Sequence, residues 1–173
     1  MSDQNAILVG RFDGFVWIRC EGKGSFLNSP LMKDWVDKEL SNGCARVVVD
    51  LEMCKGMDST FMGTLAGMAM KLAKVPNGKM EVVSASERSH RSLDDLGLSA
   101  LMEIFADVGG YTDLVDELRD GLKESKPVAE TDRTKHVFDA HKTLCEADDC
   151  NNDKFSAVLE CLEAELTERK PKS

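Results

Sequence analysis

Apolar and polar stretches alternate along the N-terminal part of the chain in a way that predicts strands and helices in turn. Residues 5–21 contain two short apolar runs around Asp13-Gly14, and this pair favours a β-hairpin because both residues tolerate a positive φ. Residues 45–51, ARVVVDL, hold a run of β-branched valines, which is typical of a strand buried on both faces. Two further strands are expected at 79–84 and 101–105.

Apolar residues at helical spacing fill the segments between these strands. Asn28 and Pro30 predict the start of the first helix, as N-cap and first-turn proline, and Asn42-Gly43 predicts its end. Small residues in the second helix would let it sit close to the sheet. The expected helices run from Pro30 to Leu40 and over 59–74, 84–98 and 111–122, the first with an apolar face of Leu31, Trp35, Val36 and Leu40. This order predicts an α/β fold in which helices pack on a mixed sheet of four to five strands.

The periodic pattern stops after residue 124, and the sequence divides there into two parts. Residues 125–133 are polar and predict a linker. Residues 134–173 then predict a C-terminal α-helical hairpin, with helices at 134–146 and 153–169. Two amphipathic helices of this size bury little surface alone, so they are expected to pack on the first domain, 1–124, or on a second copy. A homodimer through the C-terminal helices is therefore one expected assembly.

Composition and charge narrow the function classes. The chain is 42% hydrophobic and 31% charged, as expected of a globular protein that buries a core. A net charge of -9 disfavours binding to nucleic acid and to anionic membranes, and it favours a protein partner with a basic face. No apolar run approaches the roughly 20 residues of a membrane span, and the start lacks a secretion signal. The six cysteines show no paired spacing, so a cytoplasmic protein with reduced thiols is expected.

One segment carries a recognisable motif. The predicted central strand ends in Asp50-Leu51, and a short loop then delivers Asp58-Ser59-Thr60 to the start of a helix. The segment VVVDLEMCKGMDSTFMGTLAGMAMKL resembles the core motif of the STAS domains of anti-sigma factor antagonists. Leu96-Gly97-Leu98 is similar to a second motif of that family, and the element order over residues 5–122 also fits. The resemblance implies a STAS-like fold for residues 1–124.

The resemblance also implies a function and partners. Ser59 matches the serine that a serine-kinase anti-sigma factor phosphorylates and that a PP2C-type phosphatase restores. The unphosphorylated form would bind the kinase and thereby free a sigma factor. Phosphate on Ser59 would place about -1.5 to -2 charges at the positive end of a helix dipole, repelling the partner while the fold persists. The protein is then a switch that acts by binding, not an enzyme, and it needs no cofactor or metal.

Two residues near this turn depart from the family pattern. Phe61 stands where the family has glycine, and it is expected to cover part of the Ser59 hydroxyl or to enlarge an apolar contact surface. Ser25 stands where many members carry an acidic residue in a loop beside the phosphoserine, which leaves the identity of the partner open. The switch turn and partner surface predicted around the phosphoacceptor Ser59 comprise Ser25, Met57, Asp58, Thr60, Phe61 and Met62.

Other interpretations of the same residues stay open. Asp58 or Ser59 can simply cap the following helix, and a STAS scaffold or transporter-associated subunit without phosphorylation would then assemble through the C-terminal helices. A hydrolase built on Ser59 and a distant histidine is disfavoured because no Gly-x-Ser-x-Gly elbow surrounds this serine. A zinc site is disfavoured because its candidate ligands match no strong finger spacing. Those candidates are His136, His141, Cys145 and Cys150, with His141 and Cys145 expected in core packing.

Overall fold

The computed structural model describes residues 4–126 and 132–169, and it opens with the predicted hairpin. The strands β1 (Ala6–Phe12) and β2 (Phe15–Gly24) pair antiparallel around Asp13-Gly14. Gly14 has a φ of 86°, a conformation that strains residues with a side chain. The Asp-Gly pair therefore sets the hairpin register, as its turn chemistry predicts.

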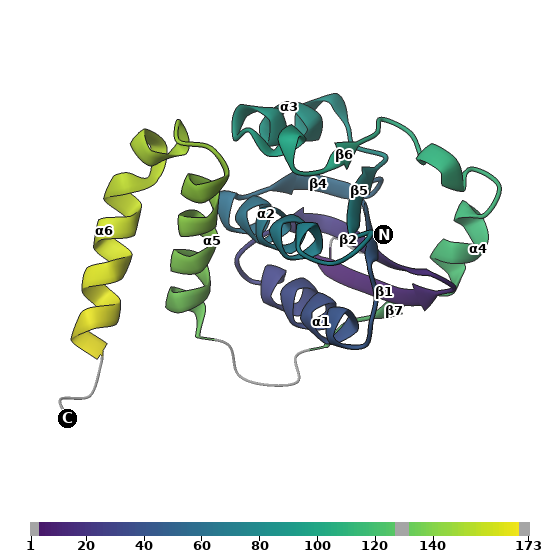
Figure 1. Cartoon of the computed structure of the whole chain (residues 1–173), viewed down its shortest axis with the longest axis horizontal. Coiled ribbons are helices and arrows are strands. Elements are labelled where there is room, and N and C mark those ends of the chain that lie inside the picture. Colours follow the sequence, from purple (N-terminus) through teal and green to yellow (C-terminus); the bar gives the residue numbers. More distant parts are fainter. Residues whose placement is uncertain (1–3, 127–131, 170–173) are drawn as a thin grey trace.

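The strands form one sheet in the order β6-β5-β3-β2-β1-β7 (Figure 1). The central strand β3 (Arg46–Asp50) runs parallel to β2 on one side and to β5 (Lys79–Val83) on the other. Three short strands complete the sheet: β4 (Cys54–Met57) beside β2, β6 (Glu103–Ile104) beside β5, and β7 (Lys123–Glu124) beside β1. The described residues thus hold seven strands where four to five were expected, because β4 and β7 are too short and too polar to leave a strand pattern.

The central strand is buried on both faces, as its sequence predicted. Val47 and Val49 face a core formed with α1, α2 and α3, whereas Val48 faces a second core with Trp17 and Tyr111. The bounds of the first layer of helices are Ser29–Ser41 for α1, Ser59–Ala73 for α2 and Glu87–Asp95 for α3. Over the second core lie α4 (Val115–Asp120) and a 3-10 turn at Gly109–Tyr111, and another such turn spans Leu98–Ala100.

Two predicted helices differ in detail. In α1 the fully buried apolar side chains are Met32 and Val36, so the buried face is rotated from the expected one. Three of the residues expected on that face are only partly buried: Leu31, Trp35 and Leu40. The helix α4 is shorter than the predicted 111–122 because the segment around Tyr111 forms a 3-10 turn before it begins.

The C-terminal helices pack on the first part of the same chain. Of the predicted linker 125–133, residues 127–131 lie outside the described residues; α5 (Arg133–Ala147) then lies against α2, and α6 (Asn151–Arg169) packs against α5 (Figure 1). A Cβ added to Gly63 in α2 would lie 2.3 Å from the Ala140 carbonyl oxygen, so the helices touch backbone to backbone. Gly63 thus lets α5 approach α2 closely at this position. From the sequence, the small residues of α2 were expected to let this helix sit close to the sheet. Leu144 of α5 is fully buried in the main core.

Candidate functional site

The strand β4 determines where α2 begins, and with it the position of Ser59. The Asp58 amide donates to the Gly24 carbonyl at 2.9 Å, and α2 starts at the next residue. Asp58 is the N-cap: its Oδ1 accepts the Phe61 amide at 2.8 Å and its Oδ2 accepts the Phe26 amide at 2.9 Å. One carboxylate therefore ties the loop after β2 to the first turn of α2, while the Ser59 side chain stays partly exposed.

Phe61 lies in the core and not beside Ser59 on the surface, which corrects the sequence-based expectation. Its side chain is fully buried and packs against Gly24, where an added Cβ would lie 2.8 Å from atoms of the ring. Thr60 and Met62 are also buried, with 4% and 8% of their surface exposed. Phe61 consequently adds no exposed apolar surface to the turn, because the glycine opposite gives its ring space in the interior.

The loop after β2 exposes two apolar side chains that the sequence pattern did not predict. Phe26 and Leu27 are 39% and 55% exposed, since apolar residues in a loop have no periodic partner to place them. Ser25 is 7% exposed, and its amide donates to the Asn28 Oδ1 at 2.9 Å. Asn28 thus holds this loop and makes no side-chain cap to α1, contrary to prediction. Met57 is partly buried beside the loop.

The Ser59 hydroxyl meets a histidine from the C-terminal extension. Ser59 Oγ lies 2.8 Å from Nε2 of His141, across 82 positions of sequence. The other ring nitrogen, Nδ1, lies 2.7 Å from the Val137 carbonyl oxygen, and the ring packs edge-on against Phe155 of α6 at 5.0 Å between centroids. His141 was expected in core packing, and it is indeed 4% exposed. Its contact with Ser59 left no local signal in the sequence, because only the docking of α5 on α2 brings the two together.

A second buried histidine makes a similar contact one turn and a half earlier on α5. His136 Nε2 lies 2.7 Å from Ser29 Oγ at the start of α1 and 3.4 Å from Thr64 Oγ1 in α2. Burial lowers the pKa of His136, and the nearby positive charge of Lys33 lowers it further. The neutral ring is therefore favoured, and it joins α5 to α1 and α2.

The residues that were considered as zinc ligands are engaged elsewhere. His136 and His141 bond to serine hydroxyls, Cys145 Sγ contacts the Asn151 carbonyl at 3.7 Å, and Cys150 is exposed. Within residues 4–126 and 132–169, no three His, Cys, Asp or Glu side chains gather into a group that could hold a metal ion. In the same described part of the chain, none of the helices has both the length and the apolar character needed to cross a bilayer.

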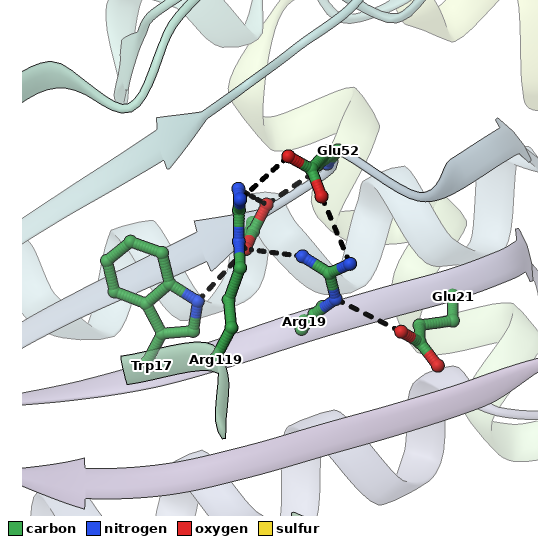
Figure 2. A network of polar contacts seen from close by, with 6 residues as sticks. Trp17, Arg19, Glu21, Glu52 and Arg119 are labelled. Atoms are coloured by element: carbon green, nitrogen blue, oxygen red, sulfur yellow. Dashed lines mark hydrogen bonds and ion pairs between the residues drawn. The ribbon is translucent and has the colours of Figure 1, made fainter. Parts of the chain in front are cut away.

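Asp50, the acidic residue of the predicted motif, is fully buried at the end of β3, where it holds an ion network (Figure 2). It accepts hydrogen bonds from Trp17 Nε1 at 3.2 Å, Arg19 Nη1 at 3.2 Å and Arg119 Nε at 2.8 Å. The half-exposed Glu52 bridges the same two arginines, at 3.1 Å and 2.7 Å. The network thereby ties α4 to the centre of the sheet.

Opposing effects act on the Asp50 carboxyl. Burial raises its pKa, but the hydrogen bonds from Arg119 and the Glu52 amide, with the charges of Arg119 and Arg19, outweigh burial and hold the pKa below its usual value. Asp50 therefore stays ionised with both arginines. The carboxylates and guanidinium groups of this network bond to one another, so we infer that the network stabilises the fold.

The first part of the chain is similar in sequence or structure to known proteins. The model of the STAS domain family matches residues 6–110, and the match ends before α5 and α6. No curated protein matches the chain in sequence. A candidate anti-sigma factor antagonist from Thermotoga maritima superposes with a TM-score of 0.53 at 21% identity, covering 64% of this chain and 92% of that one.

Two structures of another protein are similar in the same way. The anti-sigma factor antagonist SpoIIAA in its unphosphorylated form has a TM-score of 0.53 at 16% identity, with 66% of this chain and 98% of that chain covered. The Bacillus cell-fate determinant SpoIIAA in its phosphorylated form has a TM-score of 0.52 at 18% identity, with 66% and 100% covered. These similarities confirm the predicted STAS-like fold, a mixed sheet with helices, and the structure itself shows the added C-terminal helical pair.

Proposed function

Because this chain belongs to the STAS domain family, we propose that it is a protein-interaction switch of the anti-sigma factor antagonist type, with Ser59 as its phosphoacceptor. The observation that supports this most is the position of Ser59, the first residue of the 15-residue helix α2, directly after its N-cap Asp58. The residue is partly exposed there, which supports access by a partner kinase. The position of the Asp-Ser-Thr turn at the start of a helix supports a role as a phosphorylation switch.

The switch acts through charge at the start of α2. Phosphate on Ser59 would add about -1.5 to -2 charges where the helix dipole is positive, so the protein itself tolerates the modification. The same charge would lie beside the Asp58 carboxylate and would repel a partner surface shaped to a neutral hydroxyl. Phosphorylation is therefore expected to change binding and to leave the fold intact.

The partner surface is formed by exposed groups around that turn. Phe26 and Leu27 are its apolar part, and the Phe26 amide donates to Asp58, the residue before Ser59. Met57 adds a partly buried, adaptable side chain, whereas the buried Ser25, Thr60, Phe61 and Met62 support the surface from below. A net charge of -9 suits a partner with a basic face.

The proposed partner is a serine-kinase anti-sigma factor. The unphosphorylated chain binds this kinase and frees a sigma factor, phosphorylation at Ser59 ends the binding, and a PP2C-type phosphatase reverses the modification. In this proposal the chain acts in the cytoplasm by binding a protein, without catalysis of its own, and it contacts neither nucleic acid nor membrane.

Phosphorylation by a serine-kinase anti-sigma factor of the same organism tests the proposal. Incubation of the full chain with that kinase and ATP is expected to add one phosphate, located at residue 59 by peptide mass spectrometry. Ser59→Ala should abolish the mass gain. Ser41→Ala, which removes an exposed hydroxyl on α1, should leave it unchanged. Phosphate on another residue, or none on the unmodified chain, would sink the proposal.

A further inference from the structure

The contact between Ser59 and His141 has a defined direction. The Val137 oxygen is a carbonyl and can only accept, so Nδ1 of His141 carries the hydrogen that this 2.7 Å contact requires. In a neutral imidazole Nε2 is then an unprotonated acceptor. The Ser59 hydroxyl therefore donates its hydrogen to Nε2 across 2.8 Å. Proteins build an activated serine from three parts: the hydroxyl, an imidazole that accepts its hydrogen, and a group that orients the imidazole.

The imidazole is also held in place. It is 4% exposed, it packs against the Phe155 ring, and the backbone contact between Gly63 and Ala140 fixes α5 on α2 nearby. The charged residues adjacent in sequence to its contacts are Asp58 before Ser59, the exposed Lys142 after His141 on α5, and Lys154 before Phe155 on α6, which donates to the Asp95 carbonyl. Asp58 thus supplies the negative charge at this end of α2.

We propose that His141 is a second residue of the Ser59 switch, which takes the hydroxyl proton during phosphoryl transfer and then, as an imidazolium, pairs with the phosphate. The inference rests on the proposed function of Ser59. In the transfer, Ser59 Oγ attacks the terminal phosphorus of a nucleoside triphosphate held by the partner kinase. The bond from that phosphorus to the leaving nucleoside diphosphate breaks as the bond to Ser59 forms, and the Ser59 proton moves to Nε2.

The phosphorylated form of Ser59 requires the proton that His141 Nε2 has taken. The phosphate dianion has oxygens that only accept, so an unprotonated Nε2 would face acceptors and the present contact would be lost. An imidazole ordinarily titrates near pH 6.5, and an adjacent negative charge favours its protonated form. Protonation therefore converts the hydrogen bond into an ion pair and keeps α5 docked. The C-terminal extension becomes part of the switch because it contributes the group that distinguishes serine from phosphoserine.

The first test needs no kinase, because phosphoserine can be incorporated at position 59 during translation of the full chain. Proton-carbon NMR then follows the histidine rings with pH. Phosphoserine at 59 should move the midpoint of the His141 titration up by at least one pH unit, a tenfold gain in proton affinity. The exposed His90, which pairs with Asp94, serves as the internal control and should not move. An unmoved His141, or loss of the α2–α5 contacts on phosphorylation, overturns the inference.

A second test separates proton transfer from a structural role. His141→Gln keeps a hydrogen-bonding side chain but cannot accept the proton. With the partner kinase and ATP, the wild-type phosphorylation rate should rise with pH through the titration of an imidazole, and the variant should be at least tenfold slower with that dependence lost. Equal rates with equal pH profiles contradict the inference. Failure of the kinase to modify the wild-type chain counts against the proposed function, and the NMR titration still decides the role of His141.

Discussion

At the scale of single residues, Asp58 does most to fix the geometry around Ser59. Its two carboxylate oxygens accept from two different segments, the first turn of α2 and the loop after β2. Each bond satisfies an amide that would otherwise lack a partner in the protein. The residue before the phosphoacceptor is thus both a helix cap and a loop anchor.

Replacing Asp58 tests this double role. Asp58→Ala should lower the free energy of unfolding by about 1 to 2 kcal/mol, because it removes the cap of α2 and the anchor of the loop. Asp58→Asn keeps one side-chain oxygen and should lose less. Urea unfolding measures the stability, and hydrogen exchange of the Phe26 amide reports the loop. Equal losses in the two variants would show that only one of the two bonds matters.

The buried Asp50 predicts a pH dependence of stability. The pKa of Asp50 is lower in the folded protein than in the unfolded chain, where a carboxyl titrates near pH 3.9. The unfolded chain therefore binds the proton first, and this part of the stability is present above about pH 4 and is lost as the pH falls further.

Asp50→Asn leaves two arginines without their central carboxylate and should cost about 3 kcal/mol at pH 7. The cost should shrink by pH 3, because the wild type loses its ionised carboxylate there. Glu52→Gln is the matched control: its side chain is 43% exposed, and it should cost less than about 1 kcal/mol. A penalty for Asp50→Asn that stays constant from pH 7 to pH 3 contradicts the assigned charge state.

At the scale of elements, the docking of α5 on α2 depends on one glycine. Gly63 faces backbone atoms of Ala140, whereas Gly67, one turn later, would place a new Cβ 3.8 Å from the Thr143 methyl group, an ordinary contact. Both glycines are intrinsically unfavourable in a helix interior. They are therefore a matched pair in which only tertiary packing differs.

Alanine at these two positions should have opposite effects. Gly63→Ala should push α5 off α2, lower the stability by about 1 to 3 kcal/mol and speed hydrogen exchange in α5 at least tenfold. Gly67→Ala should raise the stability by up to about 1 kcal/mol and leave exchange in α5 unchanged. If the two variants behave alike, the close contact does not hold the extension in place.

The elements differ in how far their sequences predicted them. β3 and α2 were predicted well because continuous β-branched residues and helical spacing are local signals. β4 left no such signal, and its pairing with β2 sets the start of α2. The sequence therefore predicted the Asp-Ser-Thr turn but neither the burial of Phe61 nor the contact with His141, since both arise where distant segments meet.

At the scale of the whole molecule, the extension and the sheet share a core. Leu144 of α5 is fully buried in the same cluster as the helices and strands of the family domain. Leu144→Ala should therefore cost about 2 to 5 kcal/mol and lower the Tm of a single calorimetric transition. A variant in which the extension melts separately, with the main transition unmoved, would show two independent units.

We expect phosphate on Ser59 to control binding of the whole molecule to a protein partner. The affinity for a serine-kinase anti-sigma factor of the same organism is compared between the unmodified full chain and the full chain with phosphoserine incorporated at position 59, with phosphoserine at the exposed position 41 as the control. Tight binding is expected for the unmodified chain and for the control, and at least tenfold weaker binding with phosphoserine at 59. Equal affinity of all three forms, or no binding by the unmodified chain, would contradict this expectation.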